Sequence, residues 1–128
     1  MALDARAEAM LDEAKIMVLA TARPDGRPHA IPIWFVWHGG RLYFGTDTDT
    51  VKVRNIMHQP EVVAVIERGG QDGASHAVIL RGPAVRVATE DIPAGAVTRF
   101  RSKYAWDPAT RSGATAFFAV APTHIRAW

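Results

Sequence analysis

The stretch HAIPIWFVWHGGRLYFGT, residues 29–46, decides the fold, because two strand-like segments flank a pair of glycines. Large apolar side chains occupy both alternating sets of positions in residues 29–38, which indicates a strand covered on both faces. Gly39 and Gly40 predict a tight hairpin turn, since glycine tolerates positive φ at both central positions. Pro32 cannot donate a hydrogen bond to a neighbouring strand, so it predicts a sheet edge or a bulge.

Short strands and helices continue outward from this hairpin. Helical spacing of apolar residues predicts helices, runs of β-branched and aromatic residues predict strands, and Gly or Pro marks turns. The expected elements are a helix over 1–15, strands over 16–21, 29–38 and 41–46, a helix over 49–57, strands over 61–67 and 75–88, a helix over 91–104 and a strand over 115–128. A loop is expected over 69–73, and Gly82 with Pro83 predicts a kink in the longest strand.

Six strands with mostly hairpin connections favour a mainly β, α+β architecture. We expect a six-stranded antiparallel barrel with a few peripheral helices, in a single domain over 1–128. The composition is that of a folded domain, because 48% of the 128 residues are hydrophobic. The chain has 15 Lys and Arg and 13 Asp and Glu. The net charge of +2 does not indicate a nucleic-acid partner.

The absence of Cys from the sequence excludes disulfides, thiolate nucleophiles and Cys-ligated metal sites. No apolar run is long enough to cross a membrane, and the charged first fifteen residues lack the apolar stretch of a signal peptide. We therefore expect a cytoplasmic protein without a membrane partner. Basic side chains gather late in the chain, at Arg99, Arg101, Lys103 and Arg111, either as a solvated helix face or as a surface that faces an anion.

The segment TDTDTVKVRN, residues 46–55, is the most informative for function. Its hydroxyl-rich first half leads into an expected helix, and helix N-termini carry unpaired amides and partial positive charge that suit a phosphate. Thr46, Thr48 and Thr50 would add hydroxyl donors, and Lys52 would add a charge within the first turn. Ordinary capping with solvated basic side chains is the other interpretation, and composition alone favours it.

No pattern indicates catalysis by the side chains themselves, so no catalytic residue is identified. The five His residues lack metal-ligand spacing, which predicts no metal site, and the sequence has no nucleophile motif or carboxylate pair. The aromatic residues at 34, 35 and 37 could stack on a planar ligand or belong to a core or dimer interface. A bound cofactor could carry the difficult step, which favours hydride transfer over hydrolysis.

Three segments, in this order, resemble the flavin-binding split β-barrel superfamily of pyridoxamine 5′-phosphate oxidase-like proteins. They are VLATARPDGRPHAIPIWFVW at 18–37, GGRLYFGT at 39–46 and TDTVKVRNIMHQPEVVAVIE at 48–67. The resemblance implies a six-stranded antiparallel split barrel that forms a homodimer, with two cofactors in grooves between the subunits. It also raises the phosphate interpretation of residues 46–55 above ordinary capping.

The resemblance further implies which residues contact the cofactor, the first four along its ring and most of the others near its phosphate. These residues are Ile31, Pro32, Ile33, Trp34, Thr46, Thr50, Val51, Lys52, Arg54 and Asn55. In the pyridoxamine phosphate oxidases a second basic residue precedes the lysine, whereas Val51 stands here, and the Arg- and His-bearing segment that holds the vitamin substrate has no counterpart. A true pyridoxamine phosphate oxidase is therefore not expected.

The short form Lys-x-Arg-Asn at 52–55 is more similar to the branch that uses the deazaflavin coenzyme F420, with FMN as the alternative cofactor. Arg54, together with Arg99, Arg101 or Lys103, could form a basic rim for the oligoglutamate tail of F420. The expected function is an oxidoreductase that passes a hydride between the cofactor and a small planar substrate. The alternative is a non-catalytic flavin or deazaflavin carrier or sensor of the same fold, and a nucleic-acid-binding barrel is disfavoured by the low net charge.

Overall fold

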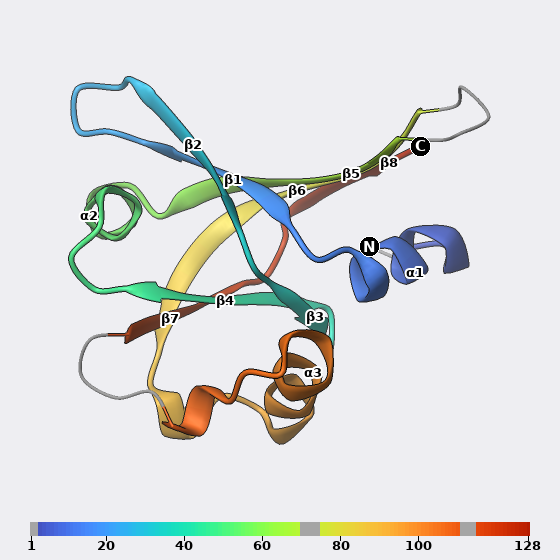
Figure 1. Cartoon of the computed structure of the whole chain (residues 1–128). Coiled ribbons are helices and arrows are strands. Elements are labelled where there is room, and N and C mark those ends of the chain that lie inside the picture. The colour runs from blue at the N-terminus through green and yellow to red at the C-terminus, as the bar shows by residue number, and fades with distance from the viewer. Residues whose placement is uncertain (1–2, 70–74, 111–114) are drawn as a thin grey trace.

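The computed structural model describes residues 3–69, 75–110 and 115–128, and it forms a folded β-sheet with three α-helices (Figure 1). Most of the expected loop over 69–73 lies outside the described residues, as does Arg111. The elements in chain order are α1 (Ala5–Glu13), β1 (Met17–Ala22), β2 (Pro28–Ile33), β3 (Val36–His38), β4 (Arg41–Asp47), α2 (Val51–His58), β5 (Glu61–Gly69), β6 (Ser75–Val87), the 3-10 turn η1 (Thr89–Asp91), α3 (Ala94–Tyr104), the 3-10 turn η2 (Pro108–Thr110), β7 (Thr115–Val120) and β8 (His124–Ala127).

The sheet has eight strands, so the expectation of six was wrong. The strand expected over 29–38 is interrupted between β2 and β3 at Trp34 and Phe35. The backbone N–H of Phe35 donates to the Tyr104 hydroxyl at 3.0 Å, and its carbonyl accepts from Tyr104 and Lys103. Because residues of α3 hydrogen-bond both the backbone N–H and the carbonyl of Phe35, this residue cannot pair with a neighbouring strand.

The strand expected over 115–128 is also interrupted, between β7 and β8. Residues 121–123 cross β6 there, with the amide of Thr123 donating to the carbonyl of Arg81 at 2.8 Å. A Cβ atom added at Gly82 would lie 2.6 Å from the carbonyl oxygen of Ala121, so only glycine permits this crossing. Neither interruption follows from local periodicity, because both depend on contacts between distant segments.

All strand pairs are antiparallel, in the order β2-β1-β5-β6-β7-β4-β3, with β8 added to β6. The two end strands, β2 and β3, are not paired with each other, so the sheet is open where a closed barrel would be joined. β6 pairs with β5 as far as Pro83 and with β7 from Ala84 onward. This change of partner at the expected kink folds the sheet into two facing layers (Figure 1).

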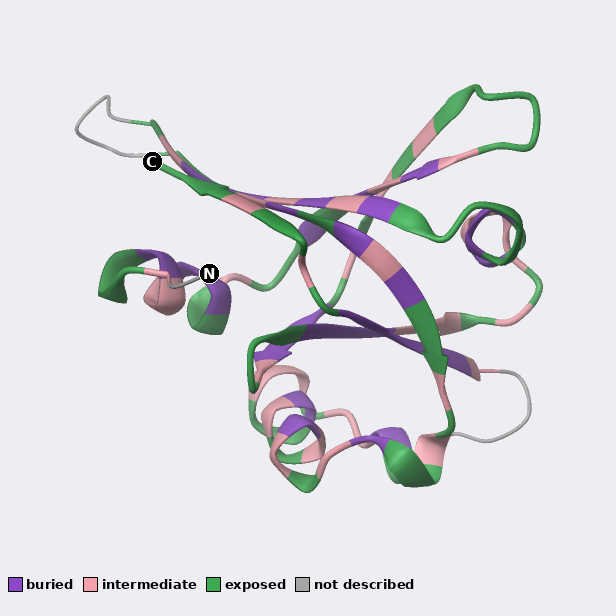
Figure 2. Cartoon of the chain, turned by 180° about the vertical axis from the view of Figure 1, so that it is seen from behind, coloured by how far each residue is buried: buried purple, intermediate pink, exposed green. Residues whose placement is uncertain are grey.

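The main core lies between the two layers, and the helices close it. α1 contributes Met10 and Leu11 at one end, and α2 contributes Val53 and Ile56 at the other. α3 covers the outer face of the layer formed by β3, β4 and β7, where Phe100 packs in a second cluster (Figure 2). In the described chain no helix is long and apolar enough to span a bilayer.

The outer face of the other layer, formed by β1, β2, β5, β6 and β8, carries no helix in either view (Figures 1 and 2). Cross-strand register places Val18, Val65 and Ile79 in one row across this face. Val18 is 42% exposed, and Val65 and Ile79 are half-buried. This row is an apolar surface that the described chain leaves uncovered.

A buried polar contact fastens α2 to the sheet. The Asn55 side-chain amide donates to the Thr21 hydroxyl at 3.0 Å, and these two are the buried polar residues of the described chain. A buried polar group without its partner costs about 1–3 kcal/mol, so this pair sets where α2 docks on β1.

We predict that Gly82→Ala lowers the free energy of unfolding by roughly 1–3 kcal/mol, because the new methyl group must displace the backbone of residues 121–123. Denaturant unfolding measures the change. Val85→Ala on the same strand is the control, since Val85 is 60% exposed and its truncation should change stability by less than about 0.5 kcal/mol. Equal stability of the Gly82→Ala variant and the unmodified chain would contradict the crossing.

Candidate functional site

The N-terminus of α2 lacks a side-chain cap. Thr50 occupies the cap position with extended backbone, and no side chain accepts from the first amides of the helix. The Thr50 hydroxyl instead donates to the carbonyl of Asp47 at 3.0 Å. The first amides of α2 therefore remain available to an acceptor, which is the arrangement that suits an anion.

The two basic residues of this helix are used differently. Lys52 is half-buried and makes no hydrogen bond or ion pair within the described residues, whereas Arg54 donates to Asp49 at 2.8 Å. Burial lowers the pKa of the Lys52 ammonium from its usual value, and the nearby Asp47 carboxylate offsets part of the shift. Lys52 is thus the cation that a bound anion would neutralise, while Arg54 already has a partner.

Two adjoining hollows form a groove along β4. One, of about 330 Å³, is lined by Ile33, Trp34, Gly45, Phe100 and Trp106. The other, of about 190 Å³, is lined by Gly45, Thr46, Asp47, Trp106 and Thr115. Because they share Gly45 and Trp106, we treat them as one feature, the β4 groove. Its first part is aromatic and apolar, and its second part is polar and ends at Asp47, beside Lys52.

Trp34 forms one wall of the β4 groove and is held by α3. Its ring stacks on Tyr104 with centroids 4.5 Å apart and planes 9° from parallel, yet Trp34 remains 46% exposed. The Tyr104 hydroxyl contacts the backbone of Phe35 and Lys15, and burial raises the pKa of Tyr104 to about 12. A neutral, hydrogen-bonded tyrosine therefore fixes the tryptophan in place.

The structure brings together three of the residues that the sequence points to, since Ile33, Trp34 and Thr46 line the β4 groove. Thr50 and Lys52 lie at the adjoining start of α2. The remaining five lie outside the groove lining. Ile31 packs against the core, Pro32 pairs with Val18 and is exposed, Val51 is half-buried in α2, Arg54 is bound to Asp49, and Asn55 is buried against Thr21.

Sequence reasoning missed the residues that complete the β4 groove from distant segments. Gly45 is required there because an added Cβ would lie 2.5 Å from the Phe117 ring on the paired strand. Trp106 follows Ala105, whose positive φ of 50° ends α3 and turns the chain back over β7. Trp106 packs edge-on against Phe100. No local pattern marks these residues, since each depends on tertiary pairing.

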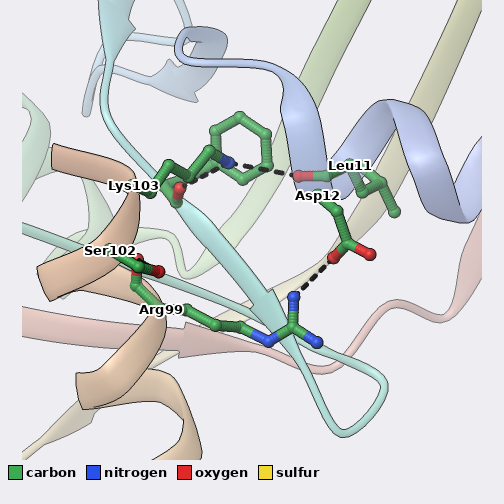
Figure 3. Close-up of polar contacts among 6 residues, drawn as sticks. Leu11, Asp12, Arg99, Ser102 and Lys103 are labelled. Carbon is green, nitrogen blue, oxygen red and sulfur yellow. Dashed lines mark hydrogen bonds and ion pairs between the residues drawn. The ribbon is translucent and has the colours of Figure 1, made fainter.

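The basic cluster of α3 forms intramolecular contacts. Arg99 pairs with Asp12 at 2.6 Å, and Arg101 pairs with Asp107 at 2.8 Å. The hydrogen bonds from the Ala109 amide and from Arg101 lower the pKa of the Asp107 carboxyl. The third residue, Lys103, reaches into the junction with α1 (Figure 3). The described part of the cluster is therefore a structural network that ties α3 to its neighbours.

Other features of the described residues are weaker candidates for the site. Among the described residues no three His, Asp or Glu side chains gather in a way that could hold a metal ion. His29 is the described residue whose buried side-chain atom, Nδ1, has no hydrogen-bond partner. A further hollow, of about 450 Å³, lies between α1 and the end of β5 and is lined by none of the residues implied for the cofactor. The candidate site is the β4 groove, because there, among the described residues, a cation, open amides and aromatic walls converge.

Comparisons with known proteins agree with this architecture. The family model described as pyridoxamine 5′-phosphate oxidase matches residues 3–128. An F420 reductase of known structure is 25% identical, with a TM-score of 0.74 and an alignment that covers 97% of this chain and 98% of that one. A comparison with curated protein sequences finds no match.

Two further solved structures share the fold at lower identity. The heme storage protein HutZ from Vibrio cholerae is 16% identical with a TM-score of 0.78, and 98% of this chain aligns with 94% of it. A heme-binding protein from Mycobacterium smegmatis is 21% identical with a TM-score of 0.79, and the whole of this chain aligns with 55% of it. The family model spans nearly the full length and the architecture is shared, so this chain belongs to the pyridoxamine 5′-phosphate oxidase family.

Proposed function

We propose that the protein is an oxidoreductase that binds coenzyme F420, with FMN as the alternative cofactor, and transfers a hydride to or from a small planar substrate. The observation that carries this proposal is the half-buried Lys52, which has no partner in the described chain and stands at the uncapped start of α2 beside the β4 groove. A cation and open amides at one end of an aromatic groove suit a cofactor with a phosphate at one end and a flat ring at the other.

The residues present fit the phosphate of such a cofactor. The donor set comprises the Lys52 ammonium, the first amides of α2 and the Thr46 hydroxyl in the adjoining hollow. Arg54 could join them by exchanging its exposed contact with Asp49, which costs little at the surface. Asp47 repels an anion, so the phosphate would lie on the Lys52 side of that carboxylate.

The ring end fits the apolar part of the β4 groove. When bound, either cofactor supplies a ring that accepts or donates a hydride. The chain would orient that ring with the Trp34 and Trp106 walls and keep water away from it, because no charged side chain lines this hollow within the described residues. Family membership supports a flavin-type cofactor, and the F420 reductase at 25% identity supports F420 as the first choice.

We further propose that two copies associate through the uncovered face of β1, β5 and β6. Its row of Val18, Val65 and Ile79 is apolar, and a second copy would remove it from water. Pro32, two residues before Trp34, pairs with Val18 on the same face. A dimer formed there would therefore lie close to the ring end of the site, as the family resemblance implies.

We predict that Lys52→Ala weakens F420 binding by roughly 1.5–3 kcal/mol, about 10- to 150-fold in Kd, because the variant loses a charge-assisted bond to the phosphate. Fluorescence titration with F420 and with FMN measures the loss. Arg68→Ala is the matched control, since Arg68 is an exposed cation paired with Glu13 away from the groove. Unchanged affinity in Lys52→Ala, or binding of hemin in place of both cofactors, would contradict the proposal.

We predict that cofactor affinity decreases as the pH rises through the lowered pKa of Lys52. The anion stabilises the ammonium, so its contribution is complete while free Lys52 is protonated and is lost above that pKa. Lys52→Arg should bind the cofactor without this alkaline decrease, because a guanidinium does not titrate in the same range. Binding isotherms from pH 7 to pH 10 compare the two proteins, and parallel profiles would contradict the role of Lys52.

We predict that Val65→Lys converts the protein to a monomer, because a lysine at the centre of the apolar row would place a charge in the interface. Sedimentation velocity measures the mass of the particle in solution. Val85→Lys is the control, since Val85 is exposed on the part of β6 that pairs with β7. The same particle mass for Val65→Lys and for the unmodified protein would rule out this face.

Turnover separates the enzyme from the carrier or sensor. Stopped-flow mixing of the cofactor-loaded, reduced protein with a panel of planar acceptors measures reoxidation. An enzyme should accelerate reoxidation for some acceptors and not for others, whereas a carrier would bind the cofactor and leave every rate unchanged.

A further inference from the structure

Lys103, in the last turn of α3, lies outside the proposed cofactor site at the junction of three segments (Figure 3). Its Nζ atom donates to the carbonyl of Leu11 in α1 and to the carbonyl of Phe35 between β2 and β3, both at 3.1 Å. The same atom lies 3.9 Å from the centre of the Phe35 ring. The amine is therefore held at a fixed position by two acceptors that both belong to other elements.

The charged surroundings of this amine are predominantly positive. Arg99 comes from α3, Lys15 from the segment after α1, and Asp12 from α1, where it is paired with Arg99. Tyr104 also faces the amine, with its ring 5.6 Å away, and remains neutral because its pKa is about 12. With two cations, Arg99 and Lys15, against one carboxylate, the net charge around this position is positive and would stabilise a new negative charge.

A small cavity adjoins the amine. Its volume is about 60 Å³, and it is lined by Lys103, Asp12, Arg99 and Ser102 together with the apolar side chains of Leu11, Val36 and Trp37. A single water needs roughly 10–15 Å³ by this measure, so there is room for a molecule of a few atoms. The cavity thus has room for a small reactant beside Lys103 and Arg99.

We propose that Lys103 is a carbamylation site that takes up carbon dioxide from solution. The neutral amine attacks the carbon of CO2, an N–C bond forms, one C=O π pair moves to oxygen, and the proton leaves the nitrogen to solvent. The product is a carbamate anion, and no oxidant or other co-reactant is required. The two cations nearby, Arg99 and Lys15, favour the change from a positive to a negative side chain.

The geometry suits this step. A neutral amine keeps two N–H groups for the carbonyls of Leu11 and Phe35, which leaves its lone pair at the remaining tetrahedral position. Burial lowers the pKa of Lys103 to about 8, and at pH 7.5 this leaves roughly a quarter of the amine neutral, against about one in a thousand for an ordinary lysine. A carbamate nitrogen has a single N–H, so one of the two carbonyl contacts would be given up.

Labelling tests the proposal on the intact protein. The chain is equilibrated with carbon-13 bicarbonate at pH 7.5, the carbamate is trapped as its ethyl ester with triethyloxonium, and peptide mass spectrometry locates the label. The chain has three lysines, so Lys15 and Lys52 serve as internal references. We expect the label at Lys103 to exceed that at either reference by at least about tenfold, as the difference in neutral amine requires.

The pH dependence and one variant complete the test. At constant dissolved CO2, the initial rate of labelling at Lys103 should rise from pH 7 to pH 8.5 and then level off, as the amine loses its proton. Lys103→Arg keeps a cation that can donate to both carbonyls and should lose the label at position 103. Equal labelling of the three lysines, or no label at Lys103, overturns the proposal, and this comparison uses the unmodified chain alone.

Discussion

The close approach of residues 121–123 to Gly82 is the contact on which the remaining architecture depends. At this point β6 leaves β5 for β7, and the chain crosses directly over the glycine to add β8 to β6. A side chain at that position would push the crossing outward and part the two layers. This bend positions the two layers, and with them the core between the layers, the two helices that close its ends and the β4 groove.

The last turn of α3 is the second organising feature, because it connects three distant parts of the molecule. Tyr104 and Lys103 hold the backbone of Phe35, and the positive φ of Ala105 turns Trp106 over β7. Both aromatic walls of the β4 groove are thereby fixed by neighbouring residues of one helix end. Such a groove is largely formed before any ligand arrives, which reduces the entropy that binding must offset.

Local sequence signals predict the elements and half of the candidate site. The hairpin at Gly39 and Gly40 and the helix that carries Lys52 follow from residue types within a few positions of one another, whereas the missing cap of that helix does not. The interruption at Phe35 does not, because it is created by hydrogen bonds to a helix 69 residues away. Gly45 likewise has to be a glycine because the Phe117 ring on the paired strand lies where a side chain would be. The groove could therefore not be predicted from residue spacing alone.

Lys52 and Arg54 lie in different environments, so the roles expected from a sequence motif do not hold for each of its residues. Both belong to the same Lys-x-Arg-Asn segment, yet Arg54 is exposed and paired with Asp49, and Asn55 is buried against Thr21. Asn55 therefore docks the helix on β1, and that docking presents Lys52 and the open amides to the groove. A polar residue in a binding motif can thus serve the site by fixing the helix, and its loss would weaken binding by moving α2, without removing a contact to the ligand.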